Sequence, residues 1–319
     1  MTTLPEPDRI VGGRRSNIPD RAFRSLSGLF AVVLGATLAL IALQLVVSSR
    51  LAWQTFGVLD FLAGQTWDPV ASIYGALPYI AGTVLSALIA LVIATPIGLL
   101  TAIFLAEWAP RRLAIPLTFL IELLAAIPSV VIGLWGVFVL GPFLRGTIEA
   151  WFVDTLGWIP IFSGPAFGIG LFAAGVILAI MILPTIVTIS REVITAVPRD
   201  QREAMLALGA TRWETVARAV VPYARSGIIG AIILGLGRAL GETMAVTMVI
   251  GNGQHIPRSL FDQGQTIASK IATTFNEASI GIQTSSLIAL GLVLLVITLT
   301  LNVVARLLVW RVAGAVRGA

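Results

Sequence analysis

Two residues of opposite charge stand four positions apart in an apolar part of the sequence. Arg238 and Glu242 lie in residues 226–250, which are otherwise rich in Ile, Leu, Val and Gly. Residues four apart share one face of a helix, and each charge costs about 2.5–3.5 kcal/mol at the centre of a bilayer. We therefore expect both side chains to face the protein interior or water. They would form either a structural ion pair or part of an anion pathway, for which an arginine is an apt partner.

Glu122 and Ser129 are the next candidates for such a pathway, because both fall in a second apolar stretch. Glu122 is expected either to pair with Arg238 or to be protonated. Pro128 precedes Ser129, and a proline at membrane depth either exposes backbone carbonyls to a cavity or simply kinks the helix. The predicted substrate pathway thus comprises Arg238, Glu242, Glu122 and Ser129.

The sequence gives little support for metal binding, enzymatic catalysis or nucleotide binding by this chain. The chain has no Cys, and His255 is its only His, which argues against a thiolate or histidine metal site and against an intramembrane enzyme. Its only lysine, Lys270, stands outside any Gly-x-x-x-x-Gly-Lys-Ser/Thr motif, so the chain supplies no P-loop of its own. We expect no catalytic residue, no metal site and no cofactor bound by this chain.

The elements that must position these residues are membrane helices. The chain has 319 residues, of which 57% are hydrophobic and only 12% charged, about half the charged share of an ordinary soluble domain. A span needs roughly 20 apolar residues, and six stretches meet this need, at residues 26–47, 79–105, 117–140, 167–189, 226–250 and 284–301. The sequence predicts an all-α polytopic membrane protein with six transmembrane helices.

The basic residues give the expected orientation. Most of the 21 Lys and Arg residues fall before the first span, between the second and third, between the fourth and fifth, and after the sixth. These segments alternate along the chain, so the positive-inside rule places both termini in the cytoplasm. The net charge of +5 therefore reports topology and not nucleic-acid binding. We expect a disordered basic N-terminus over 1–25, a transmembrane domain over 26–310 and a cytoplasmic tail over 311–319.

The longest predicted cytoplasmic connection, residues 191–225, has the signals of two short helices. Asp200 and Glu203 have the spacing of a capping box, as do Thr211 and Glu214, and Gly209 stands between the two pairs. Helices this short are marginal in water, so their apolar face is expected to be covered by the protein's own bundle or by a partner. A further short helix is predicted over 265–277.

The same connection resembles the EAA loop of ABC importer permeases. The resemblance rests on Glu203, Ala204, Gly209 six residues after Glu203, and Pro222 thirteen residues after Gly209. Met205 stands where the family has a second Ala. In that family the loop is the helix that seats in a groove of the ATPase subunit, so the resemblance implies that these residues couple this chain to a separate ATPase.

Residues 127–136 (IPSVVIGLWG) resemble phosphate-specific ABC permeases, and residues 237–252 (GRALGETMAVTMVIGN) resemble the C-type subunit (PstC) of that family. This resemblance implies a type I ABC importer permease fold in a bacterial inner membrane, and phosphate as the substrate. It implies as partners a second, A-type permease, two ATPase subunits that carry ATP and Mg, and an external phosphate-binding protein. It also implies that Arg238 and Glu242 matter for transport.

Two other functions remain open at this point. One is a permease for another oxyanion, sulfate or molybdate. The other is an ion-coupled secondary anion transporter or channel, which would use Arg238, Glu242 and Glu122 as a relay and in which the 191–225 connection would be merely structural.

Overall fold

The structure, a computed structural model, describes the backbone of residues 18–317 and the side chains of residues 21–307. These residues fall into two units, which meet in sequence between Val47 and Ser48. The described part of the first unit is helix α1 (Ile18–Ser48) without its last residue, which belongs to the second unit. Most of the N-terminal segment predicted as disordered, residues 1–17, lies outside the described residues. The remainder of that prediction is wrong, because α1 begins at Ile18 and residues 18–25 are helical.

Within the described residues, six helices are long and apolar enough to cross a membrane, as the sequence predicts. They cover Arg21–Phe56, Leu77–Trp108, Ser129–Leu156, Leu171–Thr195, Arg212–Gly241 and Ile282–Leu307. Some contain short π-helical turns, labelled η here along with two 3-10 turns. The helices before the third span are α2 (Arg50–Phe56), α3 (Val58–Ala63), α4 (Leu77–Ile103), which continues into η1 (Phe104–Trp108), and α5 (Arg111–Ala126).

The third span is built from several consecutive pieces. These are α6 (Ser129–Trp135), η2 (Gly136–Leu140), α7 (Gly141–Phe143), η3 (Leu144–Glu149) and α8 (Ala150–Leu156), followed by η4 (Pro160–Phe162). The predicted bounds of this span, 117–140, are wrong. Ile127 takes an extended backbone with ψ 129°, because the residue before a proline is disfavoured in a helix. The chain therefore breaks between α5 and α6, and Glu122 belongs to α5.

The second half of the chain contains α9 (Leu171–Thr195), α10 (Arg199–Ala207), α11 (Arg212–Thr215), η5 (Val216–Val220), α12 (Val221–Gly241), α13 (Met244–Val249), α14 (Ile267–Thr274), η6 (Phe275–Glu277) and α15 (Ile282–Arg317). Helix α14 with η6 confirms the short helix predicted over 265–277. The fifth span, predicted as continuous to residue 250, instead ends at Gly241, and Glu242 is extended with ψ 127°. Helix α15 covers most of the predicted tail.

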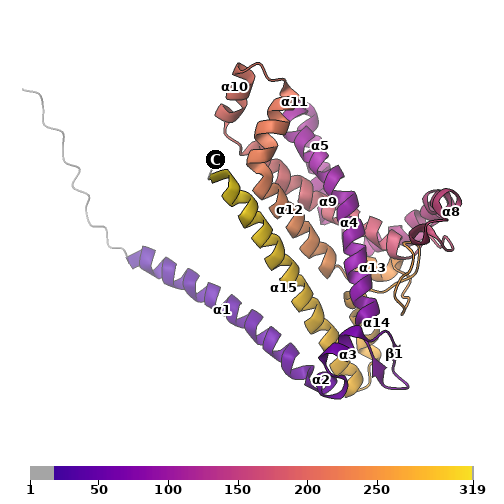
Figure 1. Cartoon of the computed structure of the whole chain (residues 1–319). Coiled ribbons are helices and arrows are strands. Elements are labelled where there is room, and N and C mark those ends of the chain that lie inside the picture. Colours follow the sequence, from indigo (N-terminus) through magenta and orange to yellow (C-terminus); the bar gives the residue numbers. More distant parts are fainter. Residues whose placement is uncertain (1–17, 318–319) are drawn as a thin grey trace, which may run out of the picture. The chain divides into compact units, whose positions relative to one another are not determined.

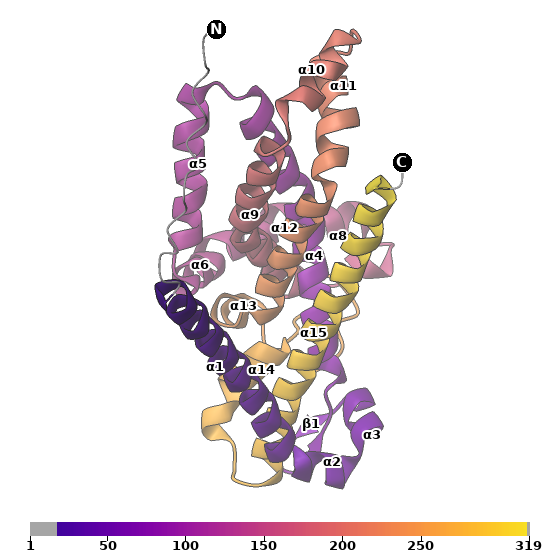
Figure 2. The same cartoon turned by 90° about the vertical axis from the view of Figure 1, so that its left-hand side faces the viewer.

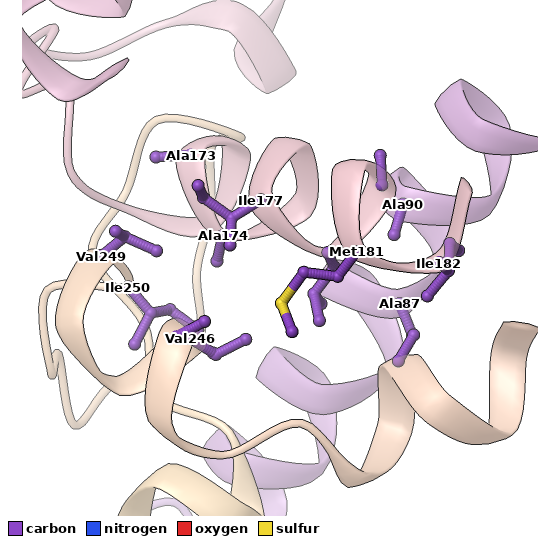
Figure 3. Packing of buried hydrophobic residues seen from close by; sticks show 14 of the residues in the cluster. Ala87, Ala90, Ala173, Ala174, Ile177, Met181, Ile182, Val246, Val249 and Ile250 are labelled. Carbon is purple, nitrogen blue, oxygen red and sulfur yellow. The ribbon is translucent and has the colours of Figure 1, made fainter. Parts of the chain in front are cut away.

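Helix α9 lies at the centre of the second unit, where α4, α12, α5 and α13 pack against it. Small and branched side chains of α4, α9 and α13 meet in the main core, as Figure 3 shows for Ala87, Ala174, Ile177 and Val249. Each of these four side chains is at most 2% exposed. In a bilayer such close packing is the main attraction between helices, so this core fixes the frame of the second unit.

Helices α10 and α11 lie at one end of the second unit, and the opposite end carries α14 and a β-hairpin (Figures 1 and 2). We call these the loop end and the hairpin end. Strands β1 (Trp67–Asp68) and β2 (Ile73–Tyr74) pair antiparallel. The side chain of Asp68 closes their turn by accepting hydrogen bonds from the backbone N–H groups of Val70, at 2.8 Å, and Ala71, at 3.1 Å.

Lys270 of α14 is buried at the hairpin end. Its Nζ lies 5.0 Å from the ring centre of Trp67 and 5.3 Å from that of Tyr79, distances at which a cation is attracted to an aromatic face. The structure gives Lys270 no carboxylate partner among the described residues. Burial therefore lowers the pKa of Lys270 to about 8, against an ordinary value of 10.5.

We expect this burial to make stability depend on pH. Between about pH 8 and 10.5 the unfolded chain keeps a proton on Lys270 that the folded chain has lost, so the cost of burying the charge disappears as the pH rises. The unfolding temperature of the detergent-solubilised protein, relative to that of Lys270→Met, should rise through this window.

Lys270→Arg is the control, because an arginine keeps its charge at these pH values and its difference from Lys270→Met should stay flat. A wild-type difference that is equally flat would contradict the assignment of a buried, titrating lysine.

Candidate functional site

Arg238 and Glu242 lie at the end of α12, but they do not form the ion pair that was one of the two expected outcomes. Arg238 is exposed and has no hydrogen-bond or ion-pair partner among the described residues. The α-helix stops at Gly241, and the carboxylate of Glu242 accepts a hydrogen bond from the backbone N–H of Ala245 at 3.4 Å. Because the helix ends between them, the two side chains no longer share one helical face. The break leaves the guanidinium of Arg238 free to meet another group.

The surface of α12 next to Arg238 is open. Gly237 and Gly241 have the Gly-x-x-x-Gly spacing, which lets two helices approach closely. A Cβ added at Gly230, Gly237 or Gly241 would meet no atom of the described chain within 4 Å. The described part of this chain therefore leaves the space directly above these three glycines unfilled.

Glu122 and Ser129 are placed on separate helices. Glu122 lies on α5, is exposed, and does not pair with Arg238, so that expected pairing is wrong. Ser129 begins α6, which packs against α13, the helix that follows Glu242. The structure thus brings the elements of Ser129 and Glu242 together and leaves Glu122 apart. Among the described residues, no group of three or more His, Asp or Glu side chains is placed to hold a metal ion.

The loop end has the two short helices that the sequence predicts, α10 and α11. Gly209 joins them with φ 82°, a left-handed conformation that favours glycine. Thr211 and Glu214 form the predicted capping box: the Thr211 hydroxyl accepts from the Glu214 N–H at 3.3 Å, and the Glu214 carboxylate accepts from the Thr211 N–H at 2.9 Å. The expected cap at Asp200 is wrong, because Pro198 holds the N-cap position and Asp200 lies inside α10.

The residues of the predicted coupling loop are accessible. Glu203 and Ala204 are exposed on α10, and Pro222 is exposed near the start of α12. Pro222 does not end a helix. It lies within a continuous helical stretch, where the preceding π-helical turn η5 accommodates a residue that has no N–H to donate. Apolar side chains are also exposed here: Leu206 at 49%, Leu208 at 85% and Trp213 at 61%.

Arg202 is the residue at the loop end that sequence reasoning missed. Its guanidinium forms the only ion pair among the described residues, with Glu107 of η1 at 2.8 Å. It also donates to the backbone carbonyls of Ile194, at 2.9 Å, and Val197. Beside it the rings of Trp108 and Trp213 stack, with centroids 6.2 Å apart. Both halves of the loop are therefore anchored to the two residues that end η1.

Residues 94–317 match the family of the binding-protein-dependent transport system inner membrane component. The match covers more than half of the chain. The chain belongs to this family. It is thus a permease: a multi-pass protein of the inner membrane, and a transport subunit, not an enzyme.

Several relatives of this permease are phosphate transport system permease proteins PstC. The relative from Pasteurella multocida is 46% identical over 300 residues, which are 93% of each chain. The relative from Haemophilus influenzae is 47% identical over 291 residues, 90% of this chain and 92% of its own. A relative from Mycobacterium tuberculosis, PstC 2, is 41% identical over 299 residues, which are 90% of this chain and 92% of its own.

Solved structures agree with the fold. An ABC transporter that imports alginate superposes with a TM-score of 0.58, at 15% identity, over 91% of this chain and 99% of its own. The MetNI methionine ABC transporter superposes with a TM-score of 0.53, at 20% identity, over 75% of this chain and 94% of its own. At these identities the similarity concerns the fold alone, and it confirms the type I ABC importer permease fold for this chain.

The capping box gives a direct prediction about the loop end. Thr211→Ala removes the side-chain cap, which typically contributes about 1 kcal/mol, so the loop should open roughly fivefold more often. The measurement is the rate of trypsin cleavage after Arg212 in the detergent-solubilised permease.

The matched control is Thr195→Ala, because the Thr195 hydroxyl bonds only within its own helix turn, to the Arg191 carbonyl at 2.8 Å. An unchanged cleavage rate in Thr211→Ala would show that the cap does not hold α11 in place.

Proposed function

We propose that this permease is the C-type subunit of an ATP-driven importer of inorganic phosphate. The observation that carries the proposal is the similarity to PstC proteins, which reaches 46% identity over 93% of the chain and so extends through the whole membrane domain. The permease would form half of the translocation pathway and move phosphate by alternating access, without covalent chemistry of its own.

The loop end supports a separate ATPase as the source of energy. Leu206, Leu208 and Trp213 are exposed there, and large apolar groups on a protruding loop are typical of a surface that a partner covers. Glu203, Ala204 and Gly209 lie on the same loop and would seat in a groove of that ATPase. Two ATPase subunits would carry ATP and Mg, and this chain would bind no cofactor.

The open stripe of α12 supports a second permease, of the A type, as the other half of the pathway. A Cβ added at Gly230, Gly237 or Gly241 would meet no atom of the described part of this chain within 4 Å, and small residues let a partner helix approach closely. Arg238 stands beside this stripe, so it would lie between the two permeases, with Glu242 and Ser129 near it. Glu122, on α5, would contribute to the pathway at another point.

Phosphate is a suitable ligand for Arg238. A guanidinium stays charged at all relevant pH values and binds oxyanions with parallel hydrogen bonds. Glu242 next to it would weaken binding enough to permit release, which transport requires. An external phosphate-binding protein would deliver the anion at the hairpin end, and the loop end, with both termini, would lie in the cytoplasm.

Reconstitution in proteoliposomes tests the proposal. The permease is combined with candidate A-type permease, ATPase and phosphate-binding protein, and uptake of labelled phosphate is measured with ATP and an excess of unlabelled phosphate or sulfate. We expect uptake that requires ATP and the ATPase, and that phosphate but not sulfate suppresses. Uptake without the ATPase would identify a secondary transporter, and equal competition by sulfate would identify a different oxyanion.

Arg238→Ala adds the test of the pathway within the same assay. Loss of a hydrogen bond to a charged group costs about 1.5–3 kcal/mol, so uptake should fall roughly ten- to a hundredfold, while the subunits still co-purify. Arg112→Ala removes an exposed arginine at the start of α5 and should keep full uptake. Full uptake by Arg238→Ala would reduce Arg238 to a structural charge.

A further inference from the structure

We infer that Glu107 and Arg202 are positioning residues that connect the coupling loop, through α4, to the helix that covers the hairpin end, α14. This inference rests on the proposed function, because it concerns how ATP binding on a partner would reach the opposite side of this permease. Helix α4 and η1 form one continuous helical span, Leu77–Trp108. It runs from the hairpin end to the loop end in Figures 1 and 2.

At the loop end, the connection is a charged hydrogen-bond network that is largely shielded from solvent. The side chains of Arg202 and Glu107 are 21% and 14% exposed. Two guanidinium nitrogens donate to the same carboxylate oxygen of Glu107, at 3.2 and 2.8 Å. Hydrogen bonds between charged groups are about twice as strong as neutral ones. A displacement of α10 should therefore take the end of η1 with it.

A second contact makes the connection resistant to rotation. Trp108 of η1 stacks on Trp213 of α11, with the two ring planes 25° apart. The ion pair fixes α10 and the stack fixes α11, and they act on adjacent residues, Glu107 and Trp108. The two contacts together transmit both a shift and a tilt of the loop.

At the hairpin end, α4 is joined to α14 by three contacts within two helical turns. The Thr83 hydroxyl accepts a hydrogen bond from the backbone N–H of Ile267 at 2.9 Å. A Cβ at Gly82 would come within 2.2 Å of the Gln265 carbonyl oxygen, so only glycine permits this approach. Lys270 lies over the ring of Tyr79. Movement of α4 thus cannot leave the start of α14 unchanged.

Because the chain has no cysteine, one introduced thiol reports on α14 in the assembled transporter. Ala268→Cys places it at a buried position, 7% exposed, and Ala272→Cys places it one turn away at an exposed position. The probe is a membrane-impermeant maleimide, added with and without a non-hydrolysable ATP analogue. Labelling is read on the band of this permease.

We expect the analogue to change the labelling rate of Ala268→Cys by about fivefold or more, the lower range of typical coupling between sites. Ala272→Cys should be labelled alike in both states. Adding Glu107→Gln should remove most of the response of Ala268→Cys and lower the phosphate imported per ATP hydrolysed, while the subunits still co-purify. Glu192→Gln, which removes an exposed carboxylate near the end of α9, should change neither. Trp108→Leu should act in the same direction as Glu107→Gln.

Two outcomes would overturn the inference while the proposed function stands. In one, the wild-type transporter imports phosphate with ATP, but Ala268→Cys never responds to the analogue. In the other, Glu107→Gln and Trp108→Leu keep both the response and the phosphate imported per ATP. A wild-type complex that shows no ATP-dependent uptake would instead contradict the proposed function, and the inference with it.

Discussion

The guanidinium of Arg202 holds the loop end of this permease together. It bonds at once to the carboxylate of Glu107 and to the carbonyls of Ile194 and Val197. The last carbonyls of a helix lack partners within it, and a positive charge is favoured at that end by the helix dipole. Helix α10 has nine residues and is too short to be stable alone in water. This side chain therefore anchors α10 to the end of α9 and to η1.

The close packing of the other helices in the second unit connects this anchored loop to the rest of the unit. Helix α9 is the most buried of the candidate spans, and α4 packs along it through alanines such as Ala87, Ala90 and Ala94, each at most 2% exposed. A core of this kind is closely packed and resists deformation. The end of α9 and η1, which continues α4, are joined by Arg202 and therefore belong to one rigid frame. The open face of α12 with Arg238 lies on the same frame. The proposed docking surface at the loop end, the proposed anion site at Arg238 and the hairpin end are therefore parts of one packed unit.

The features that the sequence predicts well are those set by residues close together in the chain. The six spans follow from hydropathy, and the Thr211–Glu214 capping box and the Gly209 elbow follow from residues close in sequence. The ion pair of Arg202 with Glu107 joins residues 95 positions apart, and no local pattern contains it. Lys270 was within reach of pattern reasoning, because it stands three residues after Ile267 and so shares the apolar face of α14.

The expectations that failed concern interactions between charges and the ends of helices. The prediction of an Arg238–Glu242 ion pair required the helix to continue past Gly241, but the helix ends there. The predicted bounds of the third span, 117–140, required one continuous helix through Pro128. Ile127, the residue before it, is instead extended. A Cβ added at Gly237 or Gly241 would meet no atom of the described part of this chain within 4 Å, and a single sequence contains no information about a partner's surface.

The most direct measurement of this rigid frame is a distance between α10 and α4 in the assembled transporter. Spin labels on Leu208→Cys and Leu100→Cys, which replace side chains that are 85% and 64% exposed, report that distance by pulsed electron paramagnetic resonance. If Arg202 fixes the coupling loop to α4 and α9, the distance distribution is the same without nucleotide and with a bound ATP analogue. A distribution that shifts when the analogue binds would show that the loop moves independently of α4, and would contradict this description of the permease.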